Sequence, residues 1–330
     1  MFNTVFIEEE LLDHPRTKHI LSKVKSKKQK TINRYDETWG VVKKPYLQKR
    51  NNLNLFIAKK KGTLIKETPD AYGTAEGKHY YFIHSYNCIY ECEYCYLQGH
   101  FNTPDIVFFI NHEDIINEMQ SIADENKGPV WFHGGEFSDS LNLSHVTNEY
   151  SLYYDFFKKN PHCFYEIRTK SVNTKEILKH SPLKNIVLSF SLGSEYATKK
   201  FDHKCPSVKA RIKAIMELSQ KGYQIGLHFD PVIFHETFLE EYKEIFSEIS
   251  KIPKSQLQYI SLGVVRFTKN VYRDVQLNYP NSSIHTQELI KSFDNKLRYN
   301  RPMRMWILNS LKSELIASGI SEDSIYLCME

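Results

Sequence analysis

The chain has 330 residues, 41% of them hydrophobic and 25% charged, with a formal net charge of +5. This length is enough for a substantial core, arranged as one large domain with a smaller appendage. No run approaches the roughly 18 apolar residues of a membrane span, and residues 1–10 lack a basic leader with an apolar core, so we expect a cytoplasmic protein without a membrane partner.

The positive charge is concentrated in two segments. Residues 16–61 hold fifteen Lys or Arg against two acidic residues, and residues 266–304 hold eight against three. The remainder of the chain is therefore acidic. Two basic segments on an acidic body indicate a polyanionic partner, usually a nucleic-acid backbone, although solvated surface lysines give the same composition.

The first 70 residues predict a small β-α-β unit. Residues 4–7 and 53–58 read as strands, residues 11–24 have apolar side chains at helical spacing, and residues 25–30 read as a polar break. We expect a small basic N-terminal domain and linker over residues 1–70. Residues 71–330 would form the main domain, with a segment near its C-terminus that contacts nucleic acid.

From residue 80 onward, strand and helix patterns alternate, which is typical of parallel βα units in an α/β fold. The predicted strands are 80–84, 129–133, 164–169, 185–192, 224–229 and 257–264. The predicted helices are 112–123, 148–158, 174–179, 207–221, 238–249 and 303–317. Reactive groups in such folds gather at the carboxyl ends of the strands.

Three cysteines directly follow the first of these strands. Cys88, Cys92 and Cys95 have the spacing C-x3-C-x2-C, which lets one loop direct three thiolates at a single centre. A tetrahedral zinc site would need a fourth ligand, for which His84 or His100 is available. A cubane iron–sulfur cluster can take three thiolates and leave one iron open to a small molecule. The odd local count argues against disulfides, and buried inert cysteines are the remaining alternative. We favour the cluster.

Tyr94 directly precedes Cys95, and with it the loop resembles the signature of radical S-adenosylmethionine (AdoMet) enzymes. The longer string Cys-Glu-Tyr-Cys-Tyr-Leu-Gln over residues 92–98 resembles the spore photoproduct lyase family. The six βα units match the partial (β/α)6 barrel of the radical AdoMet type, and residues 1–70 match a small N-terminal β-α-β appendage. The resemblance implies a 4Fe-4S cluster and AdoMet as cofactors, DNA as the partner, and an electron donor such as a flavodoxin or ferredoxin.

In that family the cluster passes an electron to AdoMet, and the resulting 5′-deoxyadenosyl radical removes a hydrogen atom from a thymine dimer in DNA. The dimer is then split into two thymines. The resemblance therefore implies a DNA-repair lyase that cleaves a carbon–carbon bond.

The resemblance also assigns cosubstrate-binding residues near the ends of predicted strands. Gly134-Gly135-Glu136 follows the second strand and resembles the element that binds the amino group of AdoMet; glycines allow close backbone approach, and a carboxylate binds an ammonium group. The expected cosubstrate-binding residues are Tyr94, Gly134, Gly135, Glu136, Ser138, Lys170 and Ser191. The expected catalytic residues are Tyr94 and Tyr96, which the family implicates in hydrogen-atom return, although packing is the commoner role of a buried phenol.

Residue 136 departs from the family pattern. The family element Phe-x3-Cys-x-Ser-Asp aligns with residues 132–139, and its cysteine, which returns a hydrogen atom to the substrate radical, is replaced by Glu136. A carboxyl group is a poor hydrogen-atom donor, so the radical-quenching step has no assigned residue. The remaining cysteines, Cys163, Cys205 and Cys328, are substitutes or ordinary structural residues.

Five residues near the C-terminus are expected to contact nucleic acid, and two of them, Arg298 and Tyr299, resemble a pair that the family uses near the DNA lesion; ordinary surface charge is the alternative. The five residues are Arg266, Lys269, Arg298, Tyr299 and Arg304. Two other functions stay open: a radical AdoMet enzyme that modifies another base in DNA or RNA, and a non-catalytic iron–sulfur or zinc module that binds nucleic acid.

Overall fold

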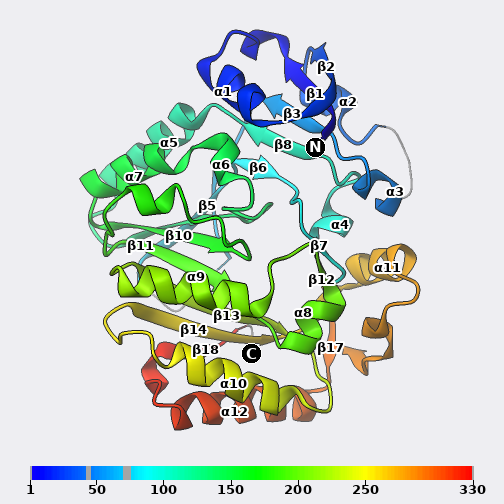
Figure 1. Ribbon diagram of the computed structural model, residues 1–330, viewed down its shortest axis with the longest axis vertical. Coiled ribbons are helices and arrows are strands. Elements are labelled where there is room, and N and C mark those ends of the chain that lie inside the picture. The colour runs from blue at the N-terminus through cyan, green and yellow to red at the C-terminus, as the bar shows by residue number, and fades with distance from the viewer. Residues whose placement is uncertain (1, 42–45, 70–75, 329–330) are drawn as a thin grey trace. The chain divides into compact units, whose positions relative to one another are not determined.

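The computed structural model describes residues 2–41, 46–69 and 76–328 (Figure 1). The chain forms two compact units. The N-terminal unit consists of Met1–Ile89, His100–Arg168 and Asn173–Ser181, and the C-terminal unit of Tyr90–Gly99, Thr169–Val172 and Pro182–Glu330. The domain boundary predicted between residues 70 and 71 lies outside the described residues. No helix in the described part of the chain is long and apolar enough to cross a bilayer.

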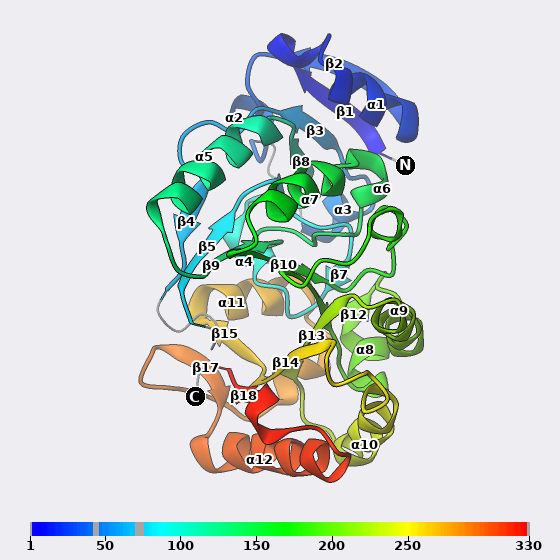
Figure 2. The same ribbon diagram turned by 90° about the vertical axis from the view of Figure 1, so that its left-hand side faces the viewer.

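A five-stranded sheet in the N-terminal unit has the order β2-β1-β3-β8-β6. Its strands are β1 (Phe2–Glu8), β2 (Ser26–Ile32), β3 (Leu55–Ala58), β6 (Ser85–Tyr86) and β8 (Ile106–Phe109), and all neighbours are parallel except β6 and β8. Helix α1 (Pro15–Lys23) connects β1 to β2, so the predicted β-α-β pattern is present (Figure 2). The sheet is larger than predicted because β6 and β8 come from beyond residue 70.

The prediction of a polar break at residues 25–30 was wrong, because these residues lie mostly in β2. This strand is at the edge of the sheet and its side chains are largely exposed, so it lacks the apolar alternation that marks a strand. Lys27, Lys28 and Lys30 lie along it. Lysines on an edge strand discourage pairing with a second chain.

The second set of strands in the N-terminal unit has the order β10-β9-β5-β4. Strands β5 (Lys78–Phe82), β9 (Val130–Gly134) and β10 (Cys163–Thr169) are parallel, and β4 (Ile65–Glu67) is antiparallel to β5. The main helices are α5 (His112–Glu125) and α7 (Tyr150–Lys159). Shorter helices are η1 (Glu9–Leu11), α2 (Tyr35–Thr38), α3 (Tyr46–Arg50), α6 (Ser144–Thr147) and η2 (Ile177–Lys179).

The C-terminal unit contains four parallel strands in the order β18-β14-β13-β11. They are β11 (Ile186–Ser191), β13 (Gln224–Val232), β14 (Leu257–Val264) and β18 (Ile325–Leu327). The connecting helices are α8 (Glu195–Phe201), α9 (Val208–Gln220), α10 (Phe238–Ile249) and α12 (Arg301–Ala317). Helices α10 and α12 lie side by side, and α12 packs against β14 (Figure 2). Gly222 has φ +91° just after α9, a conformation that glycine commonly adopts where a helix ends.

Several small elements of the C-terminal unit were not predicted. Strands β7 (Glu91–Cys92) and β12 (Asp202–His203) form an antiparallel pair. Strands β15 (Arg266–Thr268), β16 (Leu289–Lys291) and β17 (Lys296–Tyr299) form an antiparallel sheet in the order β15-β17-β16, with α11 (Lys269–Asn278) after β15. Helix α4 (Leu97–His100) and the short turns η3 (Ser283–Thr286) and η4 (Glu322–Ser324) complete the described elements.

All six strands predicted for the partial barrel are present, as β5, β9, β10, β11, β13 and β14. Within each unit these strands run parallel. No sheet of the described residues closes on itself. The strand ends therefore define where the reactive side chains are expected.

Candidate active site

The predicted site residues follow the carboxyl ends of parallel strands. The cysteine loop comes after β5, Gly134 is the last residue of β9, Lys170 directly follows β10, and Ser191 is the last residue of β11. Cys88 and Gly134 lie in the N-terminal unit, whereas Cys92, Cys95, Lys170 and Ser191 lie in the C-terminal unit.

In the N-terminal unit, two side chains hold the first cysteine. The amide of Asn142 lies 3.0 Å from Cys88 Sγ, and the guanidinium of Arg50 donates to the carbonyls of Cys88 and Ile89, both at 3.0 Å. Asp139 Oδ1 accepts the backbone N–H of Asn142 at 2.9 Å. The aspartate of the predicted Ser-Asp pair thus fixes the turn that carries Asn142 to Cys88.

In the C-terminal unit, Cys92 lies opposite Asp202 in the β7–β12 pair. The backbone N–H of Cys205 donates to the Asp202 carbonyl at 3.2 Å, and this turn brings Cys205 Sγ to 3.7 Å from Cys92 Sγ. A second turn joins Cys95 N–H to the Cys92 carbonyl at 3.1 Å. The Gln98 amide donates to the Cys95 carbonyl at 3.0 Å, so the end of the loop is also fixed.

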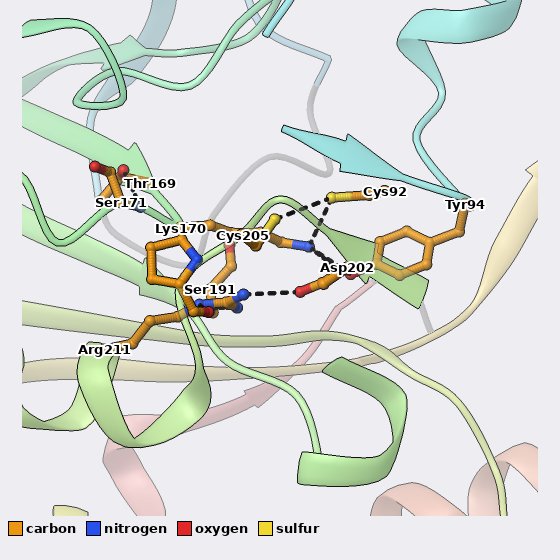
Figure 3. Close-up of polar contacts among 10 residues, drawn as sticks. Cys92, Tyr94, Thr169, Lys170, Ser171, Ser191, Asp202, Cys205 and Arg211 are labelled. Atoms are coloured by element: carbon orange, nitrogen blue, oxygen red, sulfur yellow. Dashed lines mark hydrogen bonds and ion pairs between the residues drawn. The ribbon is translucent and has the colours of Figure 1, made fainter. Parts of the chain in front are cut away.

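Lys170 is the centre of a polar network beside Cys92 (Figure 3). A turn closed by the Ser171 N–H and Thr169 Oγ1, at 2.8 Å, directs the lysine side chain. Its Nζ lies 2.8 Å from Asp202 Oδ1 and 3.4 Å from Cys92 Sγ, and it also donates to the hydroxyl of Tyr94. The predicted cosubstrate lysine, the predicted aromatic residue and a predicted cluster ligand therefore meet at one place.

Asp202 and Arg211 complete this network, and neither was predicted. The Tyr94 hydroxyl donates to Asp202 Oδ1, while Arg211 Nη2 donates to Asp202 Oδ2 at 3.0 Å. Arg211 is fully buried and also donates to the carbonyl of Ser191 at 3.0 Å (Figure 3). Both oxygens of the carboxylate are thus used by the protein itself.

The charges of this network follow from burial and proximity. Burial would raise the pKa of Asp202, but Lys170 and Arg211 outweigh it and lower the pKa to about 2. Burial opposes the charge on Lys170, but Asp202 and Cys92 raise its pKa well above the usual range. The hydrogen bond with Cys205 lowers the pKa of Cys92, whereas the same contact and burial raise the pKa of Cys205. The contact therefore favours the thiolate on Cys92 and the thiol on Cys205.

The turn at Gly134-Gly135 has little room for a side chain at either position. Gly135 has φ +85°, and a Cβ on it would lie 2.6 Å from Ser140 Oγ; a Cβ on Gly134 would lie 3.1 Å from the Tyr165 ring. Ser140 Oγ is buried and has no hydrogen-bond partner among the described residues. Glu136, half-buried, follows the turn. The Ser140 hydroxyl and the Glu136 carboxylate are both hydrogen-bond acceptors, the kind of group that an ammonium needs.

Ser138 and His84 belong to a second polar chain in the N-terminal unit. Ser138 Oγ lies 3.4 Å from His84 Nε2, and His84 Nδ1 lies 2.8 Å from Glu149 Oε1. Glu149 Oε2 in turn lies 3.4 Å from His112 Nε2. Both ring nitrogens of His84 have partners, which weakens its case as a zinc ligand.

The donor set fits an iron–sulfur cluster better than zinc. One group of three metal-ligating residues lies within 4.8 Å among the described residues, namely Cys92, Asp202 and Cys205. Lys170 and Arg211 already occupy the Asp202 oxygens, and a cation beside a metal ion is unfavourable. The N–H donor at Cys88 and the ammonium at Cys92 suit an anionic, sulfur-rich cluster, whose sulfurs accept such bonds.

The residues predicted to contact nucleic acid lie mostly inside the C-terminal unit. Arg298, Tyr299 and Arg304 are buried, and Arg266 binds Asp230 through two contacts of 2.9 Å. The Tyr299 hydroxyl accepts the Phe234 N–H at 2.9 Å and donates to Gln287 at 2.6 Å, so its ring is not exposed for stacking. Lys269, at the start of α11, is exposed.

The hairpin of β16 and β17 carries an exposed aromatic residue that sequence reasoning missed. Phe293 lies in its turn and is 89% exposed, with the Arg298 guanidinium 5.7 Å from its ring centre. A hydrophobic residue between polar neighbours in a predicted basic segment was the available signal. Tyr96 is also exposed, at 44%.

The three other cysteines occupy different environments. Cys163 is the first residue of β10, at the amino end of the strand, and burial raises its pKa to about 11. Cys205 lies against Cys92. Cys328 directly follows β18, with its Sγ 3.7 Å from an Arg266 nitrogen. None of the six cysteines, all of them in the described part of the chain, forms a disulfide.

Comparisons with known proteins find relatives of one family. The family model for spore photoproduct lyase matches residues 1–304. The spore photoproduct lyase of Clostridium acetobutylicum is 23% identical over 298 residues, which is 89% of this chain and 87% of that protein. The spore photoproduct lyase of Bacillus subtilis (strain 168) is 25% identical over 207 residues, covering 61% of this chain and 60% of that protein.

Solved structures with similar folds are also spore photoproduct lyases. One, complexed with dinucleoside spore photoproduct, has a TM-score of 0.84 at 19% identity and covers 99% of this chain and 98% of that chain. A mutant with bound AdoMet and dinucleoside spore photoproduct has a TM-score of 0.81 at 20% identity, with the same coverage. These structures confirm the predicted fold class. With a family model that matches most of its length, the chain belongs to the spore photoproduct lyase family.

Proposed function

We propose that this chain is a radical AdoMet enzyme that repairs spore photoproduct in DNA by cleaving the carbon–carbon bond between the two thymines. The observation that carries the proposal is the meeting of Cys92, Tyr94 and Lys170 in one buried network, in a chain that the family model matches over residues 1–304. Similar solved structures hold dinucleoside spore photoproduct and, in one case, AdoMet.

The cofactors of this proposal are a 4Fe-4S cluster and AdoMet. Cys88, Cys92 and Cys95 would hold the cluster through three thiolates and leave one iron for AdoMet. The bound cluster and AdoMet would supply the radical chemistry that removes one hydrogen atom from the substrate. The electron that starts this chemistry would come from a flavodoxin- or ferredoxin-like donor in the cytoplasm.

The protein's own residues orient the cosubstrate. Glu136 and the orphaned Ser140 hydroxyl would bind its ammonium group, and Ser138 and Ser191 offer further hydroxyls at the strand ends. Lys170, whose Nζ lies 3.4 Å from Cys92 Sγ, would place its positive charge near the cosubstrate carboxylate. Tyr94 is held by Asp202 and Lys170, so its ring has one fixed orientation near the cysteine loop.

Hydrogen return is the step at which this chain departs from its family. Cleavage of the carbon–carbon bond leaves a substrate radical that needs one hydrogen atom, and Glu136 cannot supply it. The phenol groups of Tyr94 and Tyr96 are the proposed donors, and Tyr96 is exposed enough to reach a bound substrate. A phenol O–H can give up a hydrogen atom, whereas an ionised carboxylate has none to give.

The test is anaerobic reconstitution of the full chain, followed by dithionite, AdoMet and dinucleoside spore photoproduct. We expect release of 5′-deoxyadenosine and recovery of thymine. We also expect Glu136→Cys to raise thymine recovered per AdoMet consumed, with Glu136→Gln as the matched control. Cosubstrate cleavage without any thymine from the wild-type chain or the Cys variant contradicts the repair activity.

A second candidate is favoured by Glu136 alone: a radical AdoMet enzyme that modifies another base in DNA or RNA. Such an enzyme needs no thiol at this position if the substrate radical takes a hydrogen atom back from 5′-deoxyadenosine. Transfer of label between a tritiated oligonucleotide and 5′-deoxyadenosine, without thymine recovery, would support it. A non-catalytic iron–sulfur or zinc module would release no 5′-deoxyadenosine at all.

A further inference from the structure

Asp202 joins three residues of the candidate site that come from distant parts of the sequence. Its Oδ1 accepts from Lys170 and Tyr94, its Oδ2 accepts from Arg211, and its backbone pairs with Cys92. We propose that Asp202 and Arg211 are positioning residues: they fix Lys170 and Tyr94 for the cosubstrate and set the electrostatic field at Cys92. This proposal rests on the proposed function.

The local structure explains how Asp202 comes to lie there. Helix α8 ends at Phe201, and β12 begins at once, so the chain turns sharply into its pairing with β7. The Glu93 N–H donates to the Phe201 carbonyl at 2.9 Å and extends this pairing. His203 Nε2 lies 2.7 Å from Glu93 Oε1 and fastens the two strands from the other side. Asp202 therefore has little freedom to move.

Arg211 fixes the carboxylate from the opposite direction. Its three bonds, each 3.0 Å, go to the carbonyls of Pro206 and Ser191 and to Asp202 Oδ2. The Pro206 bond closes the turn between β12 and α9, and the Ser191 bond reaches the carboxyl end of β11. Burying a guanidinium costs desolvation free energy unless all of its N–H groups form hydrogen bonds. Apolar side chains would fill the same space with a smaller desolvation penalty. The ion pair is therefore better explained by its effect on Lys170 than by stability.

The charge balance of this network gives the proposal a measurable consequence. Lys170 and Arg211 contribute two positive charges, Asp202 contributes one negative charge, and all three side chains are at most 16% exposed. One excess positive charge therefore lies beside the Cys92 sulfur. Positive charge near a cluster ligand stabilises the reduced cluster, because reduction adds an electron to an already anionic group.

The two substitutions should shift the reduction potential in opposite directions. Asp202→Asn removes the negative charge and should raise the potential, and Arg211→Met removes a positive charge and should lower it. We expect each variant to change the ratio of reduced to oxidised cluster at a fixed poised potential about tenfold, equivalent to about 59 mV for a one-electron couple. A residue that acts only through stability has no reason to produce shifts of opposite sign.

The experiment uses the full chain, reconstituted anaerobically and poised with redox mediators, with reduced cluster read by electron paramagnetic resonance and iron counted per chain. Asp105→Asn is the matched control, because Asp105 is a buried carboxylate of the N-terminal unit that binds Asn54 at 2.8 Å. Shifts of opposite sign with an unchanged control support the proposal. Unchanged potentials, or shifts of the same sign, overturn it.

A charge-conserving variant covers the case in which Asp202→Asn fails to fold. Arg211→Lys keeps the positive charge but cannot reach Pro206, Ser191 and Asp202 together, so we expect an unchanged potential and about tenfold weaker AdoMet binding. Wild-type AdoMet affinity in this variant would overturn the positioning role. None of these measurements uses DNA, so absence of thymine recovery would contradict the proposed function without affecting this test.

Discussion

Arg50 offers the sharpest test of how the cysteine loop is held. Its side chain, 5% exposed, donates to the carbonyls of Cys88 and Ile89 at 3.0 Å each. A hydrogen bond from a charged donor contributes roughly 1.5–3 kcal/mol. Arg50→Met keeps an unbranched apolar side chain but removes both bonds, so we expect the N-terminal unit to lose about 3 kcal/mol or more of unfolding free energy.

The loss should also appear in cluster binding, because the carbonyl of Cys88 is no longer fixed. We expect less than half of the wild-type iron per chain after anaerobic reconstitution, and a lower denaturant midpoint in cluster-free protein under reducing conditions. The control is Arg34→Met, which removes an exposed pair with Asp36 and should cost less than about 1 kcal/mol. If Arg50→Met matched this control in iron content and midpoint, the anchoring role of Arg50 would be refuted.

Three further predictions follow from single contacts. Phe293→Ala should weaken binding to damaged DNA about tenfold, because base stacking contributes roughly 1–3 kcal/mol. It should leave AdoMet cleavage in the absence of DNA unchanged. An affinity equal to that of the wild type in fluorescence anisotropy would contradict a stacking role. Burial lowers the pKa of His112 to about 4, so the unfolded chain binds its proton first as the pH falls. The free energy of unfolding should therefore drop by up to about 3 kcal/mol between about pH 6.5 and 4 and stay level above that range, and His112→Gln should flatten the drop in denaturation series. Mild diamide oxidation of cluster-free protein should join Cys92 to Cys205 in a disulfide, detectable as a cross-linked peptide by mass spectrometry. Cys205→Ser should abolish that peptide. Any other dominant cysteine pair would show that the 3.7 Å contact between the two sulfurs does not direct the reaction.

The strands of the main fold could be predicted because burial on both faces gives them continuous apolar runs. Strands β11, β13 and β14 are of this kind, and each was placed within a few residues of its observed bounds. Strand β2 has polar side chains on both faces and was missed for that reason. Strand β8 is buried throughout but only four residues long, and it pairs with β3 from far away in the sequence, so no local pattern reveals it.

The residues of the candidate site also divide into some that the sequence reveals and some that it does not. Cys88, Cys92 and Cys95 are visible because their spacing is local, and the resemblance to the family then assigns Lys170 and Ser191, which lie at strand ends. Asp202 and Arg211 belong to no local motif, and only the pairing of two two-residue strands brings Asp202 opposite Cys92. Such short pairings depend on tertiary contacts and carry almost no signal of their own.

The structure most changes the interpretation of the two basic segments. Arg50, Arg298 and Arg304 were counted among the cations available to nucleic acid, yet all three are buried and bind groups of the protein. Composition cannot separate a guanidinium that neutralises an internal carboxylate from one that faces solvent. The cations left for phosphate contacts are the exposed ones, including Lys27, Lys28 and Lys30 on β2 and Lys269 and Lys291 around the β15–β17 sheet. Binding through them should therefore weaken steeply with salt, because each phosphate contact releases condensed counterions.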